Sequence, residues 1–221
     1  MTVPRLQAVV FDLDGTLVDS IEDIGTAMNA VLEGRGLPPH PWLDYREMLG
    51  WGMRRLVTLA LPDSRRDPTT VDDALAAMRA EYGRHPLVRT RPYDGIPDLL
   101  AELVRRGIPA AVLSNKPDAM TQPIVKGLFP GTPFRFVQGE RPGVPRKPDP
   151  STSLALCAGM GRAPGEVLFL GDSEVDMETA RRAGMASGAA LWGYRGAKDL
   201  RRAGAGALLS HPMAVLDLLR P

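Results

Sequence analysis

Short apolar runs alternate along much of the chain with longer segments of helical periodicity. A strand buried on both faces of a parallel sheet is apolar throughout, whereas a surface helix repeats its apolar residues every three or four positions. The pattern therefore predicts an α/β fold in which helices cover both faces of a parallel sheet. The clearest strand predictions are 6–11, 108–113 and 167–170, and weaker ones are 134–137, 187–191 and 206–210. The helices predicted between these strands are 96–107, 117–129, 150–161, 174–184 and 212–220.

The segment from residue 18 to residue 86 interrupts this alternation. Its apolar residues follow helical spacing in four stretches that glycines and prolines separate, at 20–36, 41–50, 53–61 and 69–83. We therefore expect an all-helical cap domain at 18–86, inserted into a Rossmann-like parallel sheet core that comprises 1–17 and 87–221. Because the insertion follows the first strand directly, we expect it to cover the carboxyl end of that strand as a lid.

The composition excludes several classes of partner. Of the 221 residues 44% are hydrophobic and 24% are charged, which is typical of a globular protein, and the net charge is only +1. A chain so nearly neutral predicts no nucleic-acid partner, and no apolar run approaches the ~20 residues that span a membrane. The single cysteine excludes an intramolecular disulfide and a cysteine metal cluster. We expect a cytoplasmic protein without a membrane partner, either a monomer or a homodimer.

Each of the three clearest strands ends in polar residues. Asp12 and Asp14 follow the first strand, Ser114 the second and Asp172 the third. Ligands of open α/β sheets bind outside the carboxyl ends of the strands, so these side chains are expected to converge. Two carboxylates ~6–7 Å apart repel by roughly 2–3 kcal/mol at an effective dielectric constant of about 20. Such a pair implies a neutralising cation, or two carboxyl groups that hold different protonation states during a reaction.

Two other interpretations of the aspartate pair are available. Aspartate and glycine are common in turns, so the Asp-x-Asp pattern alone carries little information. A calcium-binding loop is excluded because Leu17 occupies the position where that loop requires glycine, and because a strand precedes the segment.

Further residues favour a site for phosphate and a metal ion. Lys147 precedes a predicted helix, and Asp176 lies four residues after Asp172 at the start of another. The helix that follows Ser114 and Asn115 can present backbone amides to an anion. Carboxylates with a lysine, a hydroxyl and exposed amides match a phosphate and a magnesium ion, because a set of oxygen ligands favours Mg²⁺ over zinc.

Together these motifs resemble the haloacid dehalogenase superfamily, and the inserted helices resemble its C1-type cap. The resemblance extends along the whole chain, and in three stretches it is to the phosphoglycolate phosphatase branch. The superfamily's four motifs correspond to DLDGT (12–16), Ser114, Lys147 and GDSEVD (171–176). The stretches that resemble the phosphoglycolate phosphatase branch are SNKP (114–117), LGWGMRRL (49–56) and WGYRG (192–196).

The resemblance implies a role for each motif residue. Asp12 is expected to attack phosphorus and form an aspartyl-phosphate, and Asp14 to protonate the leaving oxygen and then deprotonate water. Asp14 also favours phosphoryl transfer over dehalogenation, because a departing halide needs no acid. Mg²⁺ is expected to bind Asp12, the backbone carbonyl of Asp14 and Asp172, with Asp176 supporting it. The phosphoryl group is expected to bind Ser114, Lys147, Thr16 and Asn115.

Substrate choice is assigned to the cap. Gly52, Arg54 and Arg55 lie in its GWGMRR stretch, and an arginine there would suit the carboxylate of 2-phosphoglycolate. Paired arginines also commonly cover a solvated helix face, so that interpretation stays open. We therefore predict a magnesium-dependent phosphatase of a small phosphate monoester, with 2-phosphoglycolate preferred. The alternatives are a sugar-phosphate phosphatase, an inorganic pyrophosphatase, a phosphomutase or a non-catalytic binding protein.

Overall fold

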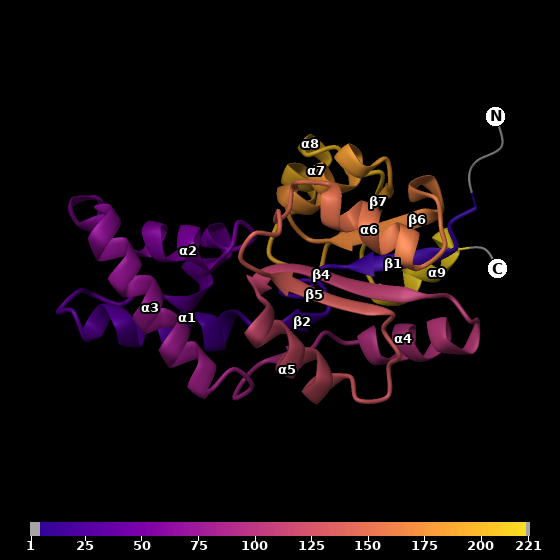
Figure 1. Cartoon of the computed structure of the whole chain (residues 1–221). Coiled ribbons are helices and arrows are strands. Elements are labelled where there is room, and N and C mark those ends of the chain that lie inside the picture. The colour runs from indigo at the N-terminus through magenta and orange to yellow at the C-terminus, as the bar shows by residue number, and fades with distance from the viewer. Residues whose placement is uncertain (1–4, 220–221) are drawn as a thin grey trace.

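A six-stranded parallel sheet forms the centre of the molecule, as a computed structural model that describes residues 5–219 shows (Figure 1). All six predicted strands are present, and the predicted α/β class with an inserted helical segment is confirmed. The strand order is β5-β4-β1-β6-β7-β8. The strands are β1 (Ala8–Phe11), β4 (Ala110–Pro117), β5 (Phe136–Glu140), β6 (Val167–Gly171), β7 (Ala186–Ala190) and β8 (Ala207–Leu209).

The position of β1 at the centre of the sheet explains why its sequence is apolar throughout. It pairs in parallel with β4 and β6, so that Val9 lies between Ala110 and Leu168. All four of its residues are fully buried. Val9 and Phe11 pack in the cluster that includes residues of α4 and α5, whereas Ala8 and Val10 pack in the cluster with α6 and α7. Figure 1 shows these helix pairs on opposite sides of the sheet.

The helices around the sheet follow the predicted order with one addition. Helix α8 was not predicted, because its six residues are too few to establish a periodicity. The predicted helix at 212–220 is only the short α9 after a 3₁₀ turn at Pro212–Ala214, and Arg220 lies outside the described residues. The helices are α4 (Ile96–Arg105), α5 (Asp118–Leu128), α6 (Ser151–Gly159), α7 (Glu174–Ala183), α8 (Ala197–Arg202) and α9 (Val215–Leu218); a 3₁₀ turn at Pro164–Glu166 precedes β6.

A two-stranded antiparallel pair, β2 (Val18–Asp19) and β3 (Arg91–Pro92), frames the inserted helices. Helices α1 (Ile21–Glu33), α2 (Met53–Ala60) and α3 (Pro68–Arg84) lie together at one side of the sheet (Figure 1). The predicted helix at 41–50 is a 3₁₀ helix at Trp42–Met48, and a short 3₁₀ turn lies at Asp63–Arg65. The predicted boundaries of the cap domain, at residues 18 and 86, stay a prediction. The two ends of the predicted core domain, 1–4 and 220–221, lie outside the described residues.

Asp23 of α1 joins the outgoing and returning ends of the insertion. Its buried carboxylate accepts hydrogen bonds from the backbone N–H groups of Arg89 and Thr90 and from the Thr90 hydroxyl, at 2.7–2.9 Å. These bonds satisfy a carboxylate that would otherwise be costly to bury. Among residues 5–219, none of the helices is long and apolar enough to cross a membrane.

Candidate active site

The loop after β1 places two carboxylates at the carboxyl edge of the sheet. The backbone N–H of Asp12 still bonds to the carbonyl of Leu170 on β6, and the Asp12 carboxylate accepts the N–H of Leu13 at 2.7 Å. Gly15 has a φ of +84°, and a Cβ there would lie 2.3 Å from an oxygen of Asp172. Glycine is therefore required at this turn, both for its backbone conformation and for the close approach of Asp172.

The structure brings Asp12, Asp172 and Asp176 into one buried cluster. One oxygen of each carboxylate lies within 4.8 Å of the others. The Nζ atom of Lys147 lies 2.8 Å from Asp12 and 2.7 Å from Asp176, so one ammonium contacts two of the three acids. With three carboxylates and one ammonium, the fully ionised cluster has more negative than positive charge. The grouping predicted from the motifs is therefore present in the fold.

Burial controls the protonation of these acids. Burial raises the pKa of Asp12 to about 7, with Lys147 opposing the shift and Asp176 adding to it. Burial also raises the pKa of Asp172 well above its usual value, and the charges of Asp176 and Asp12 reinforce the effect. Although burial alone would lower the pKa of Lys147, Asp12 and Asp176 raise it. The cluster thus favours either bound protons or a further cation.

Hydrogen bonds orient the acids that follow β6. Asp176 accepts the N–H of Ser173 at 3.0 Å and its hydroxyl at 2.6 Å. Asp172 accepts the N–H of Tyr194 at 2.8 Å and the hydroxyl of Thr16 at 3.3 Å. Thr16 was expected to bind phosphate, but in the structure its hydroxyl donates to Asp172.

Asp14 belongs to a separate network that contains a second buried lysine. Its Oδ1 atom accepts hydrogen bonds from Lys116 Nζ at 2.6 Å and from the hydroxyl of Ser20 at 2.5 Å. The hydroxyl of Ser20 also contacts that of Tyr194 at 3.3 Å. Lys116 was not among the predicted site residues. Two features of the sequence pointed to it, since the chain has only four lysines and this one directly follows Ser114 and Asn115.

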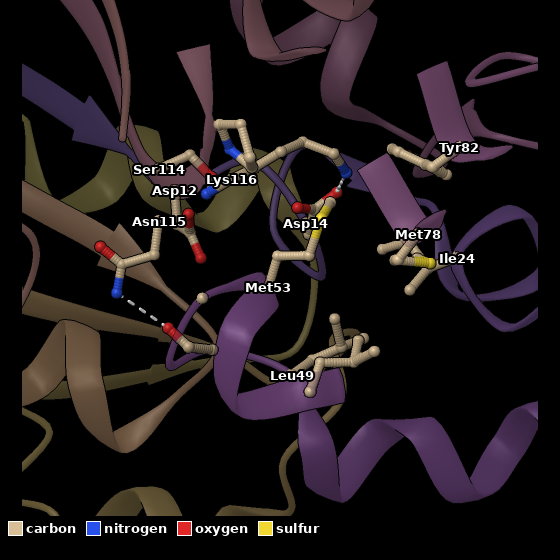
Figure 2. Close-up of a pocket in the computed structure, with 14 residues that line it drawn as sticks. Asp12, Asp14, Ile24, Leu49, Met53, Met78, Tyr82, Ser114, Asn115 and Lys116 are labelled. Carbon is tan, nitrogen blue, oxygen red and sulfur yellow. Dashed lines mark hydrogen bonds and ion pairs between the residues drawn. The ribbon is translucent and has the colours of Figure 1, made fainter. Parts of the chain in front are cut away.

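Ser114 and Asn115 lie near the carboxyl end of β4, as expected. Ser114 is buried, and its hydroxyl accepts the backbone N–H of Lys116 at 3.2 Å. The side-chain amide of Asn115 donates to the carbonyls of Gly50 and Lys147, both at 3.0 Å. Both amide protons are thus used to connect loops, so the predicted phosphate-binding role of Asn115 receives no support from its side chain. Figure 2 shows the bond from Asn115 to the loop before α2.

Other side chains fasten the loop before α2 to the core. The guanidinium of Arg195 donates to the carbonyls of Arg46 and Leu49. The indole N–H of Trp51 donates to Glu174 at 2.9 Å, and Arg195 forms an ion pair with the same carboxylate at 3.3 Å. These contacts hold the loop at the carboxyl edge of the sheet.

A cavity of about 50 Å³ lies between the sheet edge and the inserted helices (Figure 2). Polar side chains line it from the core, and mainly apolar ones from the insertion. The core residues are Asp12, Asp14, Ser114, Asn115, Lys116 and Pro117; those of the insertion are Ile24, Leu49, Gly50, Gly52, Met53, Leu56, Met78 and Tyr82.

Of the three predicted specificity residues, only Gly52 lines this cavity. Arg54 and Arg55 are exposed, and Arg54 forms an ion pair with Asp72 of α3. The reason is the phase of α2, which directs Met53 and Leu56 to the cavity and the two residues between them to solvent. The expectation that either arginine contacts substrate is therefore not supported by the structure.

Comparisons with known proteins agree with this geometry. A family model for haloacid dehalogenase-like hydrolases matches residues 6–184. The N-acetylmuramic acid 6-phosphate phosphatase of Pseudomonas aeruginosa is 35% identical over 97% of this chain and 95% of its own length. The phosphoglycolate phosphatase of Aquifex aeolicus is 33% identical over 86% of each chain.

A solved structure shows the same fold over nearly the whole chain. It is that of a candidate phosphoglycolate phosphatase from Lactobacillus delbrueckii subsp. bulgaricus, which has a TM-score of 0.92 and 30% sequence identity. The similarity covers 98% of this chain and 100% of that one. By its motifs, its fold and its relatives, this chain belongs to the haloacid dehalogenase-like hydrolases.

Proposed function

We propose that this hydrolase is a magnesium-dependent phosphatase whose substrate is a small phosphate monoester, 2-phosphoglycolate above all. One observation carries the proposal. Asp12 and Asp14 line the same cavity, and Asp12 also belongs to the buried cluster with Asp172, Asp176 and Lys147. Phosphate monoesters hydrolyse extremely slowly without catalysis, and a carboxylate nucleophile divides that barrier into two smaller ones.

The residues fit a magnesium ion. Three buried carboxylates supply hard oxygen ligands, and the raised pKa values of Asp12 and Asp172 indicate that Lys147 alone does not neutralise them. Asp12, Asp172 and Asp176 are therefore the residues that would hold the ion, with the predicted carbonyl of Asp14 in addition. When bound, Mg²⁺ supplies positive charge that offsets the carboxylates and the phosphoryl oxygens.

The protein's own groups account for both halves of the reaction. A carboxylate oxygen of Asp12 forms a bond to phosphorus while the bond from phosphorus to the ester oxygen breaks. The departing oxygen keeps that electron pair and takes a proton from Asp14. A water molecule then gives a proton to Asp14 and attacks phosphorus, which releases phosphate and restores the Asp12 carboxylate. Lys147 and the backbone near Ser114 provide positive charge and donors for the phosphoryl oxygens.

The size of the cavity favours the smaller of two substrates suggested by the relatives. A single water needs ~10–15 Å³ of such volume, so the enclosed space of about 50 Å³ accommodates a few non-hydrogen atoms, and a larger substrate would extend through the open side of the cavity. The enclosed space is on the scale of the carboxymethyl group of 2-phosphoglycolate. N-acetylmuramic acid 6-phosphate, the substrate named for the Pseudomonas aeruginosa relative, carries a substituted sugar ring several times larger.

Release of phosphate from a panel of substrates tests the proposal. The panel contains 2-phosphoglycolate, N-acetylmuramic acid 6-phosphate, hexose phosphates and pyrophosphate, each with Mg²⁺ and with a chelator. We expect magnesium-dependent turnover that is fastest on 2-phosphoglycolate, is lost in Asp12→Asn and is retained in Asp199→Asn, a control at an exposed position of α8. Preference for another ester would refute the substrate, and absence of any turnover would refute the phosphatase.

A further inference from the structure

Among the described residues that line the cavity, Lys116 has the only positively charged side chain. Its side chain is 4% exposed, and its Nζ atom lies 2.6 Å from Asp14 and 4.8 Å from the ring centre of Tyr82. Figure 2 shows the lysine crossing the top of the cavity to reach Asp14, with Met53 below and Met78 beyond. Apart from the phosphoryl group, which is assigned to Lys147 and the backbone near Ser114, an anionic part of a substrate in this cavity would have Lys116 as its nearest positively charged side chain.

Tyr82 adds a second polar group to the same wall. It comes from α3, its ring is buried, and its hydroxyl makes no hydrogen bond of ordinary length and angle among residues 5–219. An unpaired buried hydroxyl is destabilising, so a ligand that accepts its proton would restore the missing hydrogen bond. A carboxylate is such an acceptor, and it would also pair with the neighbouring ammonium of Lys116.

The chemistry fixes where such a carboxylate must lie. To receive a proton from Asp14, the ester oxygen of the substrate must come within roughly 3 Å of that carboxyl group. When the carboxylate is on the carbon that bears the ester oxygen, standard bond lengths place its oxygens about 3 Å from that oxygen. Because Lys116 Nζ is itself 2.6 Å from Asp14, it can reach them. A carboxylate farther along the substrate would have to fold back towards the ester oxygen to make the same contact.

Resting on the phosphatase proposed above, we propose that Lys116, assisted by the hydroxyl of Tyr82, binds the substrate carboxylate and selects 2-phosphorylated hydroxy acids. The selective cation thus follows Ser114 on β4 rather than lying on α2. The apolar remainder of the wall, which includes Ile24 and Leu56, offers no alternative partner for a carboxylate.

A matched pair of substrates isolates this role. 2-Phosphoglycolate and 2-hydroxyethyl phosphate have similar size and similar leaving groups, but only the first has a carboxylate. The ratio of their kcat/KM values cancels any general damage to catalysis that arises when Asp14 loses its partner. The ratio is measured for the wild type, Lys116→Met, Tyr82→Phe and Lys126→Met, the last being a control at an exposed lysine of α5.

We expect the wild type to prefer 2-phosphoglycolate, and Lys116→Met to lower the ratio by about 10- to 100-fold, which is the value of a hydrogen bond to a charged group. Tyr82→Phe should lower it several-fold, and Lys126→Met should leave it unchanged. Tyr82→Phe keeps the aromatic ring, so it decides the matter if Lys116→Met does not fold.

An unchanged ratio in a folded Lys116→Met, or in Tyr82→Phe when Lys116→Met does not fold, would overturn the inference. So would a wild type that hydrolyses both esters equally well. If the wild type hydrolyses other phosphate esters but neither member of the pair, the assignment of this substrate class falls while the phosphatase stands.

Discussion

Replacing Lys147 with methionine removes the ammonium that contacts Asp12 and Asp176 while it keeps a side chain of similar length. At 2.8 Å and an effective dielectric constant of about 20, each of these contacts is worth roughly 6 kcal/mol of Coulomb energy. The desolvation of three buried ions offsets most of that gain. Measured losses on breaking a buried pair are about 3–5 kcal/mol, and we expect a decrease of that size in the free energy of unfolding of the metal-free protein.

The loss should depend on pH in a defined direction. Burial already raises the pKa values of Asp12 and Asp172, and removal of Lys147, which lowers the pKa of Asp12, should raise the pKa of Asp12 further. Below these pKa values the folded protein takes up protons that replace the missing positive charge. The difference between variant and wild type should therefore be largest above neutral pH and should narrow towards about pH 5.

Urea unfolding with a chelator present, followed by circular dichroism, measures both quantities. Lys198→Met, at an exposed position of α8, serves as the control and should change stability by less than about 0.5 kcal/mol. A Lys147→Met protein within about 1 kcal/mol of the wild type above neutral pH would show that Lys147 does not balance the cluster.

Three further predictions follow from the same cluster. Mg²⁺ at a hundred times its dissociation constant should stabilise the wild type by about 2.7 kcal/mol, which is measured as a rise in the unfolding temperature. Asp172→Asn should abolish most of that rise, and an equal rise in the wild type and the variant would contradict the metal site. The free energy of unfolding of the metal-free protein should fall by up to about 4 kcal/mol as pH rises from about 4 to the pKa of Asp12, about 7, because only the folded state keeps the proton on Asp12 in this range. Asp12→Asn should flatten the slope of the urea midpoint against pH, and an unchanged slope would refute the raised pKa of Asp12. Gly15→Ala should abolish turnover and lower the free energy of unfolding by well over the ~1–2 kcal/mol expected for Gly36→Ala. Both glycines have a positive φ, but only at Gly15 would a Cβ lie against Asp172. Similar urea midpoints and activities for the two variants would refute this reasoning.

The sheet was predictable because its central strands are buried on both faces. The edge strand β5 was located less accurately, at 134–137 instead of Phe136–Glu140. It pairs only with β4, so most of its residues are partly exposed and its sequence includes Gln138 and Glu140. Strands β2 and β3 have two residues each, which is too short for any alternation to appear.

The site was predictable wherever a functional residue directly follows a strand. Asp12, Asp172 and the nearby Asp176 were found in this way, and the structure places them together. The position of Lys116 in the site was not predicted, because its partner Asp14 is 102 residues away and the tyrosine beside it belongs to the insertion. The arginines of α2 were misplaced because their charge was weighed more heavily than the helical phase, which buries Met53 and Leu56 instead.

The central claim is that the Asp12 carboxylate becomes phosphorylated during turnover. Asp14→Asn removes the acid of the first half of the reaction as well as the base of the second. The test therefore uses p-nitrophenyl phosphate, whose leaving group needs no acid, so that the phosphorylated enzyme should form with Mg²⁺ and accumulate for want of the base. Acid quenching, proteolysis and mass spectrometry would locate the modification. We predict one added phosphoryl group on the peptide that contains Asp12, absent from the Asp12→Asn/Asp14→Asn double variant. A phosphoryl group on another residue would contradict the account. So would turnover by the wild type when no phosphorylated enzyme is found in the wild type or in Asp14→Asn.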